Sequence, residues 1–427
     1  MNYKKRIKLV GGLKIIYITI LFVLFFYKPL SASQIYDYQT DKLIDILNNQ
    51  ILSVNEYDKK IKFKIINDNF PNAFVVEDNT IYISSGLITH SPDYVSLLAV
   101  LAHEIGHIEK YHVAKRIKEI NNLGKLNSVG NIVAIVGSMI MKEPELINTL
   151  VINQTTINNF YINFSQEQER EADSYAVKTL EKLKLPKDSL KKFLYILENK
   201  TQFNIMDDEL KKFSTHPIFE ERYEIINENN NNYNKIDTNI QKEFSFIKAK
   251  FLAYTNHEYS INLKGDQKIY YEAIRNSLSG KLFESLEKLN SLILKNDNLF
   301  LIETKADILL SYGYNKEAIE FYKKVLIHNP ENDYVKFNLF INLNIIDKEP
   351  IYIREVFIKN QNLIKLFPNN QTLLLKYHNL AKILKYNDWI EFFDILLFKK
   401  NESENYLLNL NEKTKDNNLK KLIKLYI

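Results

Sequence analysis

The chain has 427 residues, enough for two or three domains, and its lack of cysteine excludes disulfide bonds, thiolate metal ligands and a thiol nucleophile. With only 10 glycines and 9 prolines, it suits long helices better than a turn-rich all-β fold. Six of the 57 Lys and Arg residues fall within residues 1–33, which contain no acid, so the remaining 51 basic residues are balanced by 52 acidic ones and we predict no nucleic-acid binding.

Residues 1–33 have the three parts of a secretory signal. A basic beginning is followed by a 13-residue apolar core between Lys14 and Lys28, and small residues follow at Ser31-Ala32-Ser33. The core is shorter than the roughly 17 residues that span a bilayer. We therefore expect a cleaved signal peptide, and an uncleaved membrane anchor is the alternative.

The next segment predicts a short α+β region. Residues 34–52 predict an amphipathic helix and residues 61–66 a strand. Two apolar segments within residues 73–83 flank Glu77-Asp78-Asn79 and predict a β-hairpin. This hairpin either offers an edge strand to an extended peptide or is purely structural.

A well-specified helix is predicted after the hairpin. Ser91 is expected as its N-cap, Pro92 at its first position and Asp93 in its first turn. Its buried stripe is expected to consist of Leu98, Leu101, Ala102 and Ile105.

Residues 103–107 of this helix have the sequence His-Glu-Ile-Gly-His. Four residues advance a helix by roughly 400°, so His103 and His107 share a face and can hold one metal ion. Glu104 is adjacent, where a carboxylate can act as a general base. Two ordinary buried histidines would give the same pattern, so a further ligand is needed to support a metal site.

A second helix supplies a candidate acidic ligand. Ser165 and Gln168 predict a capping box at its start. Glu169 and Asp173 share a face, so Glu169 can bind the metal while Asp173 orients an imidazole. Acids at this spacing are usually solvated, but apolar neighbours favour burial here: Ala172, Ala176 and Leu180.

Between the two helices, Val129–Met141 is an apolar stretch of 13 residues, too short to span a bilayer. It is either a buried helix or a flap over the site that makes peripheral contact with membrane or substrate.

The C-terminal part predicts helical repeats. An Asn-rich run opens a predicted linker at residues 227–243, and the pattern from residue 244 is helical almost throughout. A shift of 33 residues, close to the 34-residue tetratricopeptide period, aligns Ala273 with Ala306, Gly280 with Gly313, Ser285 with Ala318 and Asn296 with Asn329. The clearest unit spans residues 299–332 and another is expected at 372–398; generic helical hairpins are the alternative.

Three motifs in this order resemble the BepA-type periplasmic metalloproteases, which belong to the wider family of the HtpX heat-shock protease and the CAAX prenyl protease. They are the motif at 103–107, Glu-x-x-x-Asp at 169–173, and Ser214-Thr215-His216-Pro217 followed by Arg222. The hairpin that begins at Asn72-Ala73-Phe74 also matches, and the resemblance covers about residues 60–255.

The resemblance implies one Zn²⁺ per chain, with three ligands: His103, His107 and Glu169. Glu104 would be the general base. His216 would stabilise the oxyanion, or occupy the open zinc position and keep the enzyme latent. Arg222 would support the site, for instance by pairing with Asp173.

We therefore predict a mainly α protein: a zincin-like α+β metalloprotease domain (residues 34–226), then an α-helical solenoid of tetratricopeptide-like repeats (residues 244–427). The predicted activity is that of a zinc endopeptidase of the periplasm. By resemblance, misfolded outer-membrane proteins would be its substrates, and the repeats would contact the outer-membrane assembly machinery. The alternative is a chaperone or adaptor with a latent zinc site.

Overall fold

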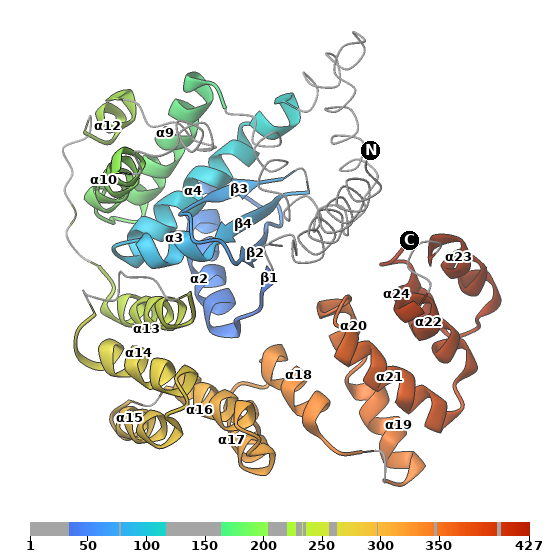
Figure 1. The fold of residues 1–427 in the computed structure, drawn as a ribbon. Coiled ribbons are helices and arrows are strands. Elements are labelled where there is room, and N and C mark those ends of the chain that lie inside the picture. The colour runs from blue at the N-terminus through green and yellow to red at the C-terminus, as the bar shows by residue number, and fades with distance from the viewer. Residues whose placement is uncertain are drawn as a thin grey trace, which may run out of the picture. The chain divides into compact units, whose positions relative to one another are not determined.

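The computed structural model describes residues 34–76, 78–116, 164–203, 220–227, 233, 236–255, 263–296, 298–345, 348–398 and 403–427 (Figure 1). The predicted signal peptide, Val129–Met141 and the motif containing His216 lie outside the described residues. Two compact units are present: the first comprises residues up to Tyr36 and Asp41–Phe251, the second Asp37–Thr40 and Leu252–Ile427.

The N-terminal elements combine a small sheet with several helices. In chain order they are β1 (Gln34–Ile35), α2 (Tyr38–Asn55), β2 (Lys62–Ile66), β3 (Ala73–Val75), β4 (Thr80–Ser84), α3 (Ser85–His90), α4 (Tyr94–Glu109), α9 (Gln166–Lys182), α10 (Asp188–Phe203), α12 (Glu220–Asn227) and α13 (Thr238–Thr255).

The sheet has the strand order β1-β2-β4-β3. Strand β2 runs parallel to β4, and β3 pairs with β4 antiparallel, with Phe74 opposite Tyr82. The predicted strand and hairpin are therefore confirmed. The helix predicted at 34–52 starts later, because residues 34 and 35 pair with β2 and Asp37 accepts a hydrogen bond from the backbone N–H of Thr40 over 2.9 Å.

The start of α4 differs from the prediction. Its N-cap is Asp93, whose side chain accepts hydrogen bonds from the backbone and hydroxyl of Ser96, both over 2.8 Å. Ser91 instead is the C-cap of α3, where its hydroxyl donates to the carbonyl of Leu87. A carboxylate is the stronger acceptor for the exposed N–H groups of a first turn, and Ser91 is already engaged.

Helix α4 is the centre of the first core. The predicted stripe is confirmed, since Leu98, Leu101, Ala102 and Ile105 are all 0% exposed. The helix packs against α9, α10 and β3, which lie around it in Figure 1. Because neighbours surround most of it, its polar side chains are buried as well, except that of Glu109 at its C-terminal end.

Helix α13 is attached to this core although it begins inside the segment predicted as a linker. The backbone N–H of Tyr94 donates to the Gln241 side chain over 3.1 Å, and the Tyr94 hydroxyl accepts from the backbone of Asp237 over 3.1 Å. The apolar face of α13 joins the same core through Phe244, Ile247 and Phe251.

All helices and strands assigned in the described residues of the second unit are helices, as predicted. Its elements are α14 (Gly265–Leu278), α15 (Leu282–Lys295), α16 (Leu299–Ser311), α17 (Asn315–His328), α18 (Asp333–Asn342), α19 (Pro350–Lys359), α20 (Asn362–Leu366), α21 (Gln371–Leu384), α22 (Asn387–Phe398), α23 (Ser403–Lys413) and α24 (Asn417–Ile423). Helices α14 and α15, α16 and α17, and α21 and α22 pack as consecutive pairs.

Positions related by the 33-residue shift are structurally equivalent in the first two pairs. Gly280 and Gly313 occupy the turns with φ of +81° and +83°, a conformation that favours glycine. Ala273 and Ala306 are both fully buried, as are Ser285 and Ala318. Asn296 and Asn329 are the C-caps of α15 and α17. Across the described residues of both units, no helix has the length and apolar character needed to cross a membrane.

Candidate metal centre

The close packing of α4 against α9 brings the predicted site together. A Cβ atom at Gly106 would lie 3.1 Å from the Cβ of Tyr175 and 3.2 Å from the Cα of Ala172. The absence of a side chain at Gly106, together with the small buried Ala172 and Ala176, lets the two helix backbones approach closely. Residues on the facing sides of both helices can therefore reach one another.

This contact yields a prediction at Gly106. A Gly106→Leu substitution is expected to push α9 away from α4, destabilise the first unit by about 1–3 kcal/mol through overpacking, and weaken metal binding. Gly106→Ala should have a smaller effect, since its neighbours need to move by only a few tenths of an ångström. Urea unfolding and zinc titration would measure both effects, with a Val100→Leu variant of the same helix as control; metal affinity unchanged in Gly106→Leu would contradict the prediction.

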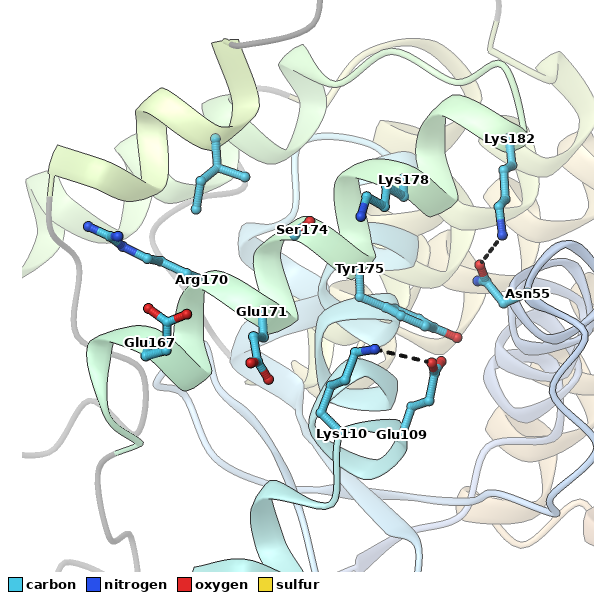
Figure 2. Close-up of a pocket in the computed structure, with 11 residues that line it drawn as sticks. Asn55, Glu109, Lys110, Glu167, Arg170, Glu171, Ser174, Tyr175, Lys178 and Lys182 are labelled. Carbon is cyan, nitrogen blue, oxygen red and sulfur yellow. Dashed lines mark hydrogen bonds and ion pairs between the residues drawn. The ribbon is translucent and has the colours of Figure 1, made fainter.

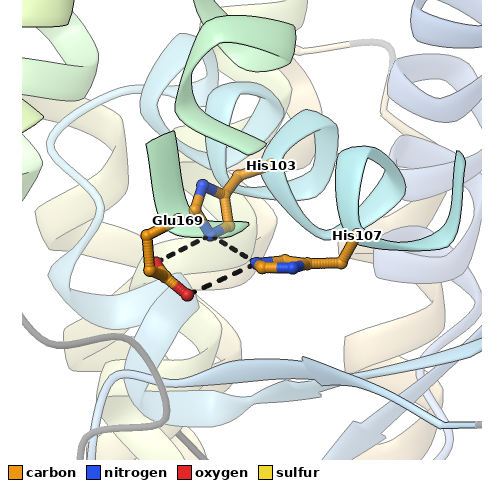
Figure 3. Close-up of side chains that lie close together, drawn as sticks. All are labelled: His103, His107 and Glu169. Carbon is orange, nitrogen blue, oxygen red and sulfur yellow. Dashed lines mark hydrogen bonds and ion pairs between the residues drawn. The ribbon is translucent and has the colours of Figure 1, made fainter. Parts of the chain in front are cut away.

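Three potential ligands converge across this contact. Figure 3 shows the imidazoles of His103 and His107, from α4, and the carboxylate of Glu169, from α9, pointing toward one another. The two Nε2 atoms are 3.1 Å apart, and each lies 3.5 Å from a Glu169 oxygen. One ligand atom from each residue falls within 4.8 Å of the others, and all three side chains are buried. Two imidazole nitrogens and one carboxylate aimed at one point fit a transition-metal ion.

Asp173 holds the ring of His103 from behind. One turn beyond Glu169 on α9, its Oδ1 lies 2.8 Å from Nδ1 of His103. This hydrogen bond directs Nε2 of His103 toward the other two potential ligands, as carboxylates commonly do for metal-binding histidines.

Arg222, from α12, completes this arrangement. Its Nε donates to Oδ2 of Asp173 over 2.6 Å and its Nη2 to Oδ1 over 2.8 Å, while Nη1 lies 3.6 Å from Glu169. Only 4% of Arg222 is exposed. A buried guanidinium thus pairs with one carboxylate in a two-pronged geometry and lies beside a second.

Neighbouring charges shift the pKa values of Asp173, His103 and Arg222. Burial raises the pKa of the Asp173 carboxyl, but Arg222 and His103 outweigh it and hold that pKa below its ordinary value. Burial lowers the pKa of His103, but its hydrogen bonds to Asp173 and Glu169 raise it above the usual range. Burial also lowers the pKa of Arg222, and the nearby carboxylates Asp173, Glu169 and Glu104 more than compensate.

Comparison with known proteins finds a family match for this region. Residues 37–230 match peptidase family M48. This region is therefore similar to the peptidases of that family.

The similarity to curated relatives covers more of the chain than this region. The beta-barrel assembly-enhancing protease of Yersinia pestis is 23% identical over 331 residues, which cover 72% of this chain and 66% of the relative. A putative beta-barrel assembly-enhancing protease of Vibrio cholerae is 24% identical over 288 residues, 63% of this chain and 58% of the relative. The beta-barrel assembly-enhancing protease of Escherichia coli K12 is 24% identical over 227 residues, which cover 53% of this chain and 46% of the relative. The chain thus spans less than two thirds of the length of these relatives.

Most site residues predicted from the sequence lie together in the region that matches family M48. His103, His107, Glu169, Asp173 and Arg222 form one connected cluster. The predicted base, Glu104, is 1% exposed and follows His103 on α4. His216 lies outside the described residues, so its predicted role stays a prediction.

The sequence did not indicate two neighbours of His107. The ring of Phe164 stacks on the His107 ring with centroids 3.9 Å apart. His112 lies with its Nδ1 2.9 Å from Nδ1 of His107. Five residues of helix would not bring His112 to the face of His107, but α4 ends at Glu109 and Tyr111 adopts φ of +58°, which turns the chain back. The only sequence signal was a third histidine soon after the motif.

Proposed function

We propose that this chain is a zinc-dependent endopeptidase. The observation that carries the proposal is the buried convergence of His103, His107 and Glu169 in a region that matches peptidase family M48, with Glu104 next to the first histidine. Two neutral imidazoles and one carboxylate are the ligands of many catalytic zinc sites, and they leave a coordination position open. When bound, Zn²⁺ supplies Lewis acidity that polarises a carbonyl and makes water more acidic.

The residues of the chain divide the remaining work. Glu104 accepts a proton from the attacking water while the oxygen of that water bonds to the scissile carbonyl carbon. Glu104 then delivers the proton to the amine nitrogen as the C–N bond breaks. Asp173 and Arg222 keep the His103 ring in place. We propose His216 as an oxyanion-stabilising group, or as a residue that occupies the open metal position in a latent state.

The sheet offers a binding mode for substrate. Strand β3 is one of the two outer strands in the order β1-β2-β4-β3, and it packs against α4, which carries both histidines. An extended peptide can pair with such an edge through main-chain hydrogen bonds. This mode recognises backbone more than side chains, which suits a protease that acts on unfolded segments.

The names of the relatives and the N-terminal signal pattern point to a setting. We propose that the chain is secreted to the periplasm through a cleaved signal peptide, with membrane anchorage as the alternative, and that it degrades misfolded outer-membrane proteins. We further propose that the second unit is a tetratricopeptide-like array which contacts the assembly machinery. The equivalence of α14–α15 and α16–α17 supports the repeat assignment.

Metal removal tests the proposal. We expect one zinc per chain by elemental analysis and degradation of casein that 1,10-phenanthroline abolishes and added Zn²⁺ restores. The 1,7 isomer, which does not chelate, is the matched reagent control. A His378→Gln variant, altered at a buried histidine of the second unit, should behave as wild type. Bound zinc without any casein degradation would contradict the protease and favour the adaptor.

A further inference from the structure

His112 is a buried residue to which the proposed reaction gives no role. It is 1% exposed and lies just beyond the C-terminal end of α4. Its Nδ1 is 2.9 Å from Nδ1 of His107, and its Nε2 is 2.8 Å from Oε2 of Glu171 on α9. The two imidazole rings meet edge to face, with centroids 5.0 Å apart and an angle of 68° between their planes. Glu171, His112 and His107 therefore form a continuous chain of short contacts that ends at the metal centre.

The chemistry of imidazole fixes the direction of these hydrogen bonds. If Nε2 of His107 is to bind a metal, it carries no proton, so the proton of the neutral ring is on Nδ1. That N–H faces Nδ1 of His112, which must then be the acceptor. His112 consequently carries its proton on Nε2, where Glu171 accepts it. Each donor meets an acceptor only in this arrangement, because two N–H groups would otherwise face each other across 2.9 Å.

We propose that His112 is a positioning residue of the metal centre, which together with Glu171 fixes the tautomer and ring orientation of His107. The inference rests on the proposed metal-dependent function. It gives His107 a supporting group equivalent to the one that Asp173 provides for His103. The difference is that the supporting group of His107 is itself a histidine, whose own tautomer depends on a carboxylate further out.

The outer end of this chain is accessible. The Glu171 side chain is 43% exposed, whereas that of Asp173 is fully buried. Figure 2 shows Glu171 on α9 near Glu167, Arg170 and Lys110. These residues line a pocket of about 620 Å³. A substitution at Glu171 is therefore expected to leave folding nearly intact and to act on the metal through His112 alone.

Zinc affinity of the full chain, measured by competition with a chromophoric chelator, tests the proposal. His112→Leu removes the acceptor and is expected to weaken zinc binding about 10- to 100-fold. His112→Asn places an amide oxygen near the position of Nδ1 and is expected to recover most of the affinity. Glu171→Ala should show a smaller loss, and Glu167→Ala, which changes an acid of the same helix and pocket, should show none.

The outcomes separate the inference from the function on which it rests. If wild type binds no zinc, the proposed function fails. If wild type binds zinc and both His112→Leu and Glu171→Ala bind it within about threefold as tightly, the positioning role is overturned. Should His112→Leu fail to fold, as judged by circular dichroism, the His112→Asn and Glu171→Ala variants decide the question.

A second measurement reports the tautomer directly. In the zinc-loaded chain labelled with ¹⁵N-histidine, NMR should show His107 protonated at Nδ1 and His112 protonated at Nε2, assigned with the His112→Asn variant. A merely structural contact would not fix this pair of tautomers. A His112 ring protonated at Nδ1 in the zinc-loaded chain would overturn the proposal.

Discussion

A Glu104→Gln variant is expected to degrade casein about 10²- to 10⁴-fold more slowly than wild type while it retains one zinc per chain. Glutamine has nearly the same size and shape but cannot accept the proton of the attacking water. Glu104 is not one of the three converging potential ligands, and it is only 1% exposed in the core of the first unit, so the substitution should leave the metal-binding geometry unchanged. Initial rates of casein cleavage, normalised to zinc content, measure the effect.

The other acid of α4 provides the matched control. Glu109 lies one to two turns further along the same helix, and Glu109→Gln should retain nearly full activity. Zinc binding intact with activity lost only in Glu104→Gln would assign the proton transfer to Glu104. If the proposed role in outer-membrane assembly is present in cells, a Glu104→Gln variant that fulfils it as well as wild type would contradict a proteolytic role and favour the adaptor.

The parts of the site that could be predicted are those governed by helix periodicity. The four-residue spacing of His103 and His107 places them on one face, and the same spacing relates Glu169 to Asp173. The capping box of Ser165 and Gln168 is present and sets where α9 begins. Local geometry is encoded by nearby residues, so a single sequence is sufficient to predict it.

The sequence gives much less information about contacts that depend on chain reversal or on the packing of distant elements. Nothing near Gly106 shows that Ala172 and Tyr175 will pack against it. The position of His112 depends on the positive φ of Tyr111, a conformation that non-glycine residues seldom adopt. Ser91 and Asp93 are both good helix caps, and their assignment depended on which was already bonded to α3.

The second unit shows the same division. The 33-residue shift aligned residues that are equivalent in the structure, with both alanines buried and both glycines in turns, because a repeat imposes the same packing on equivalent positions. Beyond α18 the helices vary in length, from 5 residues in α20 to 14 in α21, so no constant shift aligns them. Their core was nevertheless predictable as helical from its apolar spacing.

Removing Arg222 is expected to have the largest effect on stability. In Arg222→Met, the buried carboxylates of Asp173 and Glu169 lose their shared cation, which should destabilise the first unit by about 3–5 kcal/mol. Arg222→Lys should recover only part of this, because one ammonium group cannot reproduce the two-pronged contact with Asp173. Arg170→Met, at an exposed arginine of α9, should change stability by no more than about 0.5 kcal/mol.

Urea unfolding of the metal-free chain, followed by circular dichroism, measures these changes, and fluorescence of the single tryptophan, Trp389, follows the second unit separately. The physical cause can be isolated in an Asp173→Asn background, where one of the two charges is already absent. If the loss comes from an uncompensated buried charge, Arg222→Met should cost less there, with a coupling free energy of about 1–3 kcal/mol. Equal losses in both backgrounds would mean that Arg222 stabilises the domain by packing of its side chain, and that the charge pair contributes little.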